Sequence, residues 1–288
     1  MRNRSTIRFV LGTAALLTAG ACADLDVTNP NNPDIKRAPA SGEDVKNIAI
    51  STVNSWYLAA TYLEPYMMLS VTADAGAANF GNFGMRFNNL EPRAPYVNNS
   101  AGGDRNVTES PWNFNYGTLG AANDVLIAID NGVEVPNGET AKYKALAQFT
   151  QAASLANIAI LFDQGFVVDE KSAGTTPVFK KYPEVSAAAM TKWDALIASL
   201  SGKNETYDVS VIPIAAGPMT SAMLSRMANT MAARTLVYTA RTPTENAAVN
   251  WAKVVSYAEN TASSSPPPKS IKSSSSSSVH ERAVTTTR

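Results

Sequence analysis

The sequence has a single cysteine and a single histidine among its 288 residues. The histidine, His280, lies in a serine-rich stretch near the C-terminus, so the part of the chain with globular composition has none. Structural zinc sites are built from Cys and His, and hydrolytic triads use a histidine base. Both kinds of site are effectively excluded, and no metal or other cofactor is predicted. A lone cysteine also excludes a disulfide framework, which needs pairs.

Long hydrophobic runs and excess positive charge are absent too. No uncharged stretch reaches the ~20 residues that a membrane-spanning helix requires, so none is predicted. The chain has 24 basic and 24 acidic residues, but an N-terminal signal takes three of the basic ones, and a C-terminal tail takes four basic and one acidic. The remainder holds 17 basic and 23 acidic residues, a net charge of about −6. Such a surface suits nucleic acid poorly, because phosphate contacts need clustered Lys and Arg.

Residues 1–21 read as an export signal. Three arginines precede a short apolar run over residues 9–17, and four small residues then lead to Cys22. This is the order of a secretory signal, and the cysteine after the small residues predicts a bacterial lipoprotein with a lipid on Cys22. The alternative is an ordinary secretory signal with Cys22 as a free thiol, because Leu17 lies two places earlier than a lipoprotein box requires. Residues 22–40 are polar and contain prolines, which predicts an extended spacer.

Residues 41–262 show helical periodicity and predict an all-α fold. Paired helices with short links suggest helical hairpins stacked like tetratricopeptide repeats. Ser41, Ser110 and Ser186 are the predicted N-caps, with Pro111 at the first helical position. The expected helices run from Ser41 to the break at Pro65, then over about 66–71, 110–131, 139–163, 183–200, 219–240 and 244–261.

Three tryptophans lie on apolar helix faces and are predicted to pack in the core: Trp112, Trp193 and Trp251. The helix over 139–163 is apolar around most of its circumference after Phe149, which predicts burial between other helices. Two regions lack such periodicity. Residues 73–110 are rich in Asn, Gly and Pro but carry aromatic residues, which favours a functional loop over disorder. Residues 263–288 are rich in Ser and Pro, which predicts a disordered tail.

Four stretches of this chain resemble the SusD/RagB family of bacterial outer-membrane nutrient-uptake lipoproteins. Each is short, and their order after a lipoprotein signal carries the resemblance. Two departures lie in the second stretch, where Ala147-Gln148 replaces the usual Arg-Ala pair and Gln164 intervenes before a glycine. The stretches are Trp112–Tyr116 with Ala121–Leu126, Ala141–Gln148 with Leu161–Gly165, Ala228–Tyr238, and Trp251–Val255.

The resemblance implies a lipid-anchored, non-enzymatic subunit on the outside of the bacterial outer membrane. Such a subunit captures an oligosaccharide or peptide for a partner TonB-dependent transporter. Family members usually continue into a C-terminal half, where this chain has its Ser-rich tail. A truncation or a shift of reading frame near Ser263 is therefore expected, and a fragment without function is one alternative.

The family's ligand surface often includes the loop before the helix of Trp112. The candidate ligand-binding residues in that loop are Asp74, Asn79, Phe83, Arg86 and Asn88, taken as a region. The alternative is that the phenylalanines pack locally. Two other functions stay open. A helical-repeat scaffold would bind only protein partners, and a glycoside hydrolase would use carboxylates such as Asp163, Asp169 and Glu170, which lie close together in the sequence.

Overall fold

The computed structural model describes residues 39, 41–61, 63–79, 85–89, 91, 99, 102, 104–172, 175–207 and 219–261. The predicted lipid attachment at Cys22, the export signal, all of the spacer except residue 39, and the Ser-rich tail lie outside this part of the chain, as does Phe83.

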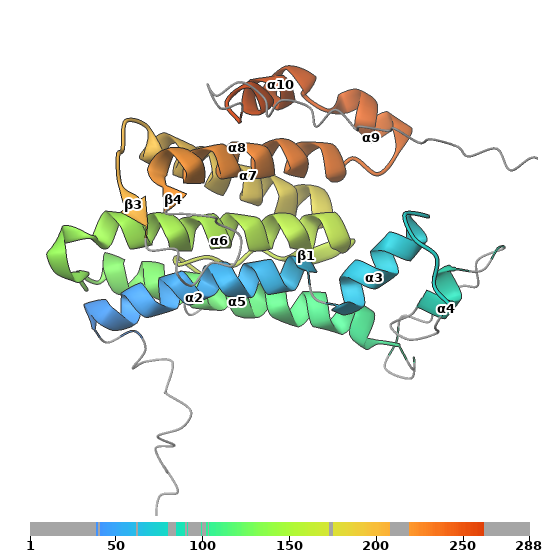
Figure 1. Cartoon of the computed structure of the whole chain (residues 1–288), viewed down its shortest axis with the longest axis horizontal. Coiled ribbons are helices and arrows are strands. Elements are labelled where there is room, and N and C mark those ends of the chain that lie inside the picture. The colour runs from blue at the N-terminus through green and yellow to red at the C-terminus, as the bar shows by residue number, and fades with distance from the viewer. Residues whose placement is uncertain are drawn as a thin grey trace, which may run out of the picture.

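Helices dominate the described residues, which confirms the all-α prediction (Figure 1). Consecutive long helices run in opposite directions, with two small β-ribbons at their ends. The helices are α2 (Gly42–Thr61), α3 (Leu63–Thr72), α4 (Met85–Asn88), α5 (Asn106–Asp130), η1 (Pro136–Gly138), α6 (Thr140–Leu161), α7 (Tyr182–Leu200), α8 (Ser221–Tyr238), α9 (Pro243–Ala248) and α10 (Trp251–Glu259). The antiparallel ribbons pair β1 (Gln164–Phe166) with β2 (Phe179–Lys181), and β3 (Thr206–Tyr207) with β4 (Met219–Thr220).

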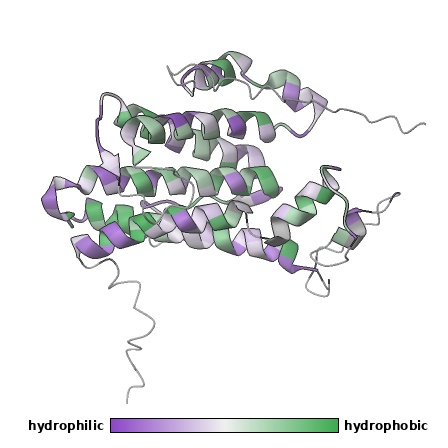
Figure 2. Ribbon diagram, viewed as in Figure 1, coloured by the Kyte–Doolittle hydropathy of each residue, from purple (hydrophilic) through white to green (hydrophobic). Residues whose placement is uncertain are grey.

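Helix α6 lies at the centre of the molecule and contacts α2, α5, α7 and α8. Its sequence is rich in alanine, and nearly every residue from Lys142 to Ala159 is buried. Alanine costs little in helical conformation and lets neighbouring helices approach closely. The prediction that this helix is enclosed by others is confirmed, and apolar residues recur along it and the helices around it (Figure 2).

Three aromatic residues from three helices form the middle of the core. Phe149 of α6 makes edge-to-face contacts with Trp56 of α2 and Trp193 of α7, with ring centroids 5.1 and 5.3 Å apart. Such arrangements add roughly 0.5–1.5 kcal/mol each to the burial of the rings. The prediction for Trp193 is confirmed, since its side chain is fully buried.

The prediction for Trp251 is wrong, because this side chain is 45% exposed. Helix α10 lies at the edge of the molecule and packs against α8. Its buried residue is Tyr257, whose hydroxyl donates a hydrogen bond to Asp194. The apolar stripe of Trp251 and Val255 therefore faces outward on this short helix.

One of the predicted N-caps is present in the structure, at the start of α2. Ser41 is confirmed as an N-cap, since its hydroxyl accepts from Asp44 N–H at 3.2 Å and Asp44 accepts from Ser41 N–H at 3.1 Å. This reciprocal pair satisfies two backbone donors at the start of α2. Gly132 and Gly202 follow the ends of α5 and α7 and have positive φ values of 93° and 71°, a conformation that glycine adopts readily after a helix.

Two other predicted caps are wrong. Helix α5 starts at Asn106 and contains Pro111, because the Thr108 and Glu109 N–H groups both bond the Arg105 carbonyl and add a turn ahead of the proline. Ser186 lies inside α7 and is buried. Helix α7 instead begins after Lys181, whose N–H donates to Glu184 at 3.2 Å.

The last predicted helix is two helices, α9 and α10, with separate caps. The Thr242 hydroxyl accepts from Glu245 N–H at 3.2 Å at the start of α9. The Asn250 side chain accepts from Lys253 N–H at 3.0 Å and begins α10. Asn competes well for backbone donors at a helix start, so the chain turns at Val249–Asn250 instead of continuing.

The β1–β2 ribbon is fixed to α5 by one tyrosine. The Tyr116 hydroxyl accepts a hydrogen bond from Phe166 N–H and donates one to the Phe166 carbonyl at 3.2 Å. Gly165 permits this approach. A Cβ at that position would lie 2.9 Å from the Tyr116 hydroxyl and 2.5 Å from Ile158 Cγ2.

Replacing Gly165 with alanine is therefore expected to lower the free energy of unfolding by about 1–2 kcal/mol, because the added methyl overpacks this junction. Urea unfolding followed by circular dichroism measures the change. Gly120→Ala is the matched control, since Gly120 lies on an exposed face of α5 and a Cβ added there would have nothing within 4 Å. That control should raise stability by about 0.5–1 kcal/mol. Equal effects at the two positions would contradict the close contact.

Candidate functional site

The loop residues predicted to bind ligand are only partly within the described chain. Asp74 follows α3, is exposed and has a positive φ of 54°. Asn79 is exposed, and Asn88 is partly buried at the end of α4. Arg86 lies in α4, and only its backbone is described. These positions place the predicted region beside α3 and α4, at one end of the molecule (Figure 1).

One side chain brings two parts of this loop together. The Asn89 amide accepts from Ala78 N–H at 3.2 Å and donates to the Ala78 carbonyl at 3.1 Å. The neighbouring residues Asn79 and Asn88 are therefore drawn to one place. These two bonds do not involve Asp74.

A cluster of five aromatic rings connects α5, the end of α6 and the β1–β2 ribbon. The ring centroid of Trp112 lies 4.6 Å from that of Tyr116 and 5.0 Å from that of Phe162. Phe166 stacks on Phe179 at 4.1 Å, and Phe179 is 50% exposed. Trp112 is partly buried within this cluster and not in the central core, which corrects the prediction in part.

The three carboxylates considered for hydrolysis do not form one group. Asp163 pairs with Arg241. Asp169 and Glu170 both bind the ammonium of Lys192, at 3.0 and 3.1 Å. Burial alone would raise the pKa of Asp169, but hydrogen bonds from Lys192 and Ser172 bring the pKa below its ordinary value. Both Lys192 partners are thus held ionised, whereas a general acid needs a raised pKa.

Glu170 is also tied to the interior. Its carboxylate accepts a hydrogen bond from the Gln151 amide at 2.7 Å, and the same amide donates to Asn123 at 2.7 Å. Burial raises the pKa of Glu170, yet the bonds from Gln151 and Lys192 outweigh burial and lower the pKa overall. The segment after β1 is therefore fastened to α5, α6 and α7 by one polar network.

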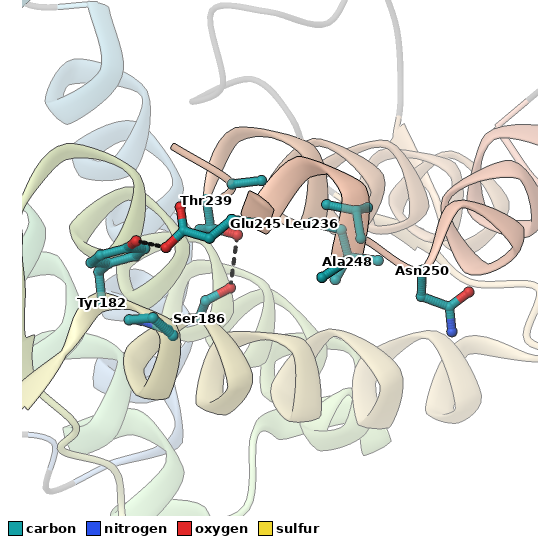
Figure 3. Close-up of a pocket in the computed structure, with 10 residues that line it drawn as sticks. Tyr182, Ser186, Leu236, Thr239, Glu245, Ala248 and Asn250 are labelled. Atoms are coloured by element: carbon teal, nitrogen blue, oxygen red, sulfur yellow. Dashed lines mark hydrogen bonds between the residues drawn. The ribbon is translucent and has the colours of Figure 1, made fainter. Parts of the chain in front are cut away.

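A small groove lies between α7, α8 and α9, and we call it the α7–α9 groove (Figure 3). Its volume is about 270 Å³. Its walls are mostly apolar, and its polar groups are a phenol, a carboxylate, two hydroxyls and an amide. The lining residues are Tyr182, Pro183, Ser186, Leu236, Thr239, Ala240, Glu245, Ala248, Val249 and Asn250.

Tyr182 and Glu245 lie at one end of the α7–α9 groove, and Asn250 lies toward the other (Figure 3). The Tyr182 hydroxyl donates a hydrogen bond to Glu245. Glu245 also accepts from the N–H groups of Arg241 and Thr242, at 2.8 and 3.0 Å. The bond from Tyr182, followed by those from the backbone, lowers the pKa of Glu245, so this end carries a stable negative charge.

Arg241 packs beside Tyr182 at the acidic end of the α7–α9 groove. Its guanidinium lies over the Tyr182 ring at 4.0 Å and ion-pairs with Asp163. It also donates to the carbonyls of Ala159 and Phe162, at 2.9 and 2.7 Å. A cation at a helix C-terminus satisfies carbonyls that have no partner within the helix, so Arg241 fastens the α8–α9 turn to the end of α6.

Among the described residues, no group of three or more His, Cys, Asp and Glu side chains gathers in a way that could hold a metal ion. None of the described helices is both long and apolar enough to cross a membrane. Comparison of the chain with models of known protein families, with curated proteins and with solved structures found no significant match.

Sequence reasoning missed the α7–α9 groove. The capping pattern Thr242-Pro243-Thr244-Glu245 was readable as a helix start. The contact of Glu245 with Tyr182, 63 residues earlier, was not. The contact depends on the packing of the end of α8 and the start of α9 beside the start of α7. Residue spacing within one helix does not predict such packing.

Proposed function

We propose that residues 22–262 form a lipid-anchored binding subunit for nutrient uptake at the bacterial outer membrane, acting with a TonB-dependent transporter. The fold expected with this function is a set of tetratricopeptide-like helical hairpins. The subunit captures an oligosaccharide or peptide and is not an enzyme.

The observation that carries the proposal is the contact between two of the stretches that resemble the SusD/RagB family. Tyr116 of the first stretch bonds both backbone groups of Phe166, directly after the Gly165 that ends the second. Trp112 of the first packs edge-to-face on Phe162 of the second. If the two stretches belong to one family pattern because they pack together, their residues are expected to be in contact. The alternation of antiparallel helices agrees with a fold of helical hairpins.

Two experiments test the proposal. Expressed with its signal in a bacterium, the chain should fractionate with the outer membrane and incorporate a fatty-acid label, whereas Cys22→Ser should lose both label and membrane association. The purified mature chain should then bind at least one ligand in a panel of oligosaccharides and peptides, measured by calorimetry. Turnover of a chromogenic glycoside would contradict the non-enzymatic assignment.

A protein-binding scaffold is the second candidate, and the outward stripe on α10 favours it. Trp251 and Val255 are 45% and 53% exposed on one face of that helix. Exposed aromatic and aliphatic side chains in a row are typical of protein interfaces. Copurification of partner proteins that is lost in Trp251→Ser, together with no ligand found in the panel, would support the scaffold over the binding subunit.

A further inference from the structure

The α7–α9 groove combines an aliphatic lining with an acidic end. Leu236, Ala248 and Val249 supply its apolar walls, and Glu245 is the one charged side chain among the described residues that line it. Recognition of a sugar uses exposed aromatic faces and a high density of hydroxyl and amide partners. In this groove the aromatic residue, Tyr182, has a face covered by Arg241 at 4.0 Å. The lining therefore fits an aliphatic ligand better than a saccharide.

Two cations close in sequence to residues of the groove, Arg241 and Lys253, are each paired with a carboxylate other than Glu245. The guanidinium of Arg241 is engaged by Asp163 and by carbonyls at the end of α6. Beyond Asn250, the ammonium of Lys253 pairs with Asp194 at 2.9 Å. The Glu245 carboxylate accepts hydrogen bonds from the Tyr182 phenol and from the N–H groups of Arg241 and Thr242, and the Thr242 hydroxyl also lowers its pKa. All of these are uncharged donors.

Hydroxyl groups extend the polar character of this end. Ser186 is buried, and its hydroxyl donates to the Thr239 hydroxyl at 3.3 Å. Thr239 in turn donates to the Thr235 carbonyl at 2.8 Å. The Ser186 oxygen keeps acceptor capacity, because a hydroxyl has two lone pairs. The end of the groove consequently presents acceptors, which suit a ligand with several N–H donors.

We propose that the α7–α9 groove binds the N-terminal end of a short aliphatic peptide. The α-ammonium lies against Glu245, and the first aliphatic side chains lie between Leu236 and Ala248. An ammonium offers three donors and a positive charge, which matches an ionised carboxylate with a neighbouring hydroxyl acceptor. This inference rests on the proposed function and narrows its ligand from oligosaccharide or peptide to peptide.

Calorimetric titration of the mature chain with leucyl-leucyl-alanine tests the groove directly. Ala248→Phe fills it and is expected to weaken binding at least tenfold, because the ligand loses its apolar contacts. Ala247→Phe is the matched control, since Ala247 is an exposed neighbour on α9 that does not line the groove. It should leave the affinity unchanged. Thermal unfolding of both variants checks that each remains folded.

The acidic end is tested by a cycle with N-acetylated peptide. Acetylation should weaken binding to the wild type by about tenfold, the effect of losing a charged hydrogen bond. Glu245→Gln keeps an acceptor for the helix cap, and in this variant acetylation should matter much less. Equal affinity for the free and acetylated peptides in the wild type would overturn the proposed orientation.

The remaining outcomes separate this inference from the function on which it rests. Peptide binding that survives Ala248→Phe, or binding of maltotriose that Ala248→Phe abolishes, would overturn the groove assignment while leaving nutrient capture intact. Failure of the wild type to bind either ligand class at millimolar concentration would overturn both. Loss of peptide binding in Ala248→Phe but not in Ala247→Phe would support both the groove assignment and the proposed function.

Discussion

Replacing Trp193 with alanine is expected to lower the free energy of unfolding by about 3–5 kcal/mol, the range for removing a large aromatic side chain from a core. The Trp193 side chain is fully buried and packs on Phe149 with ring centroids 5.3 Å apart. Phe149 lies on α6, which the other long helices surround. A cavity at this point therefore loosens the contact between α6 and α7. Urea unfolding followed by far-ultraviolet circular dichroism measures the loss.

Trp251→Ala is the matched control, because the same sequence pattern predicted both tryptophans to be buried. Trp251 is 45% exposed, and its indole N–H donates to the Asn246 carbonyl at 3.2 Å on the outer edge of the molecule. Its replacement should cost at most about 1 kcal/mol. Similar losses in the two variants would show that α10 is enclosed by something, and would contradict its placement at the edge.

Much of the fold could be predicted from the sequence because burial is encoded within single elements. The apolar circumference of α6 identified the central helix, since no exposed helix can be apolar all round. Ser41 identified the start of α2 as an N-cap, because its hydrogen-bonded pair with Asp44 is completed within four residues. Such features depend only on neighbours along the chain.

Predictions failed where a local signal had a close competitor. Pro111 is typical of a first helical position. However, backbone hydrogen bonds from Thr108 and Glu109 to the Arg105 carbonyl extend α5 back to Asn106. The apolar stripe around Trp251 resembled a core face. Only the packing of the helices against one another shows that no described element covers this face of α10. The first error concerns the residues just before the helix in the chain, and the second concerns which elements pack against it; periodicity contains neither kind of information.

The candidate site was predictable to a smaller degree. The composition of residues 73–110 predicted a loop, yet its described part includes α4 and the first turn of α5. The Asn89–Ala78 pair that brings Asn79 near Asn88 was not anticipated. The α7–α9 groove was not anticipated, because Tyr182, Ser186, Thr239 and Glu245 come from separate parts of the chain and share no spacing. Carboxylates close in sequence were equally uninformative, since Asp163 and Asp169 pair with different cations.

Replacing Lys192 with methionine is expected to lower the free energy of unfolding by about 2–3 kcal/mol at pH 7. Removing one partner of a fully buried ion pair costs roughly 3–5 kcal/mol, and the smaller value allows for side chains of Asp169 and Glu170 that are 25% and 14% exposed. Without the ammonium, two neighbouring carboxylates also repel each other. The connection between β1 and β2 would then lose its main attachment to α7.

The loss should depend on pH in a defined direction. In the folded wild type, the pKa values of Asp169 and Glu170 lie below their ordinary values near 4, because hydrogen bonds from Lys192, Ser172 and Gln151 outweigh burial. Groups with a depressed folded pKa stabilise the protein fully above the unfolded-state pKa and progressively less as pH falls through the folded one. The difference between wild type and Lys192→Met should therefore be largest near neutral pH and shrink below about pH 4.

Urea unfolding of both proteins at about pH 7, 5 and 3.5, values that bracket the ordinary carboxyl pKa, measures this trend, with Lys144→Met as the control. Lys144 pairs with Asp130 at 2.7 Å, but both side chains are more than a third exposed. A surface pair contributes about 0–1 kcal/mol, so this variant should differ little from the wild type at any of the three values. If the two lysine variants lost equal stability, or if the loss in Lys192→Met did not change with pH, the network around Lys192 would not fasten the segment after β1. The stability of that junction would then rest on the aromatic stack of Phe166 and Phe179 and on Tyr116 alone.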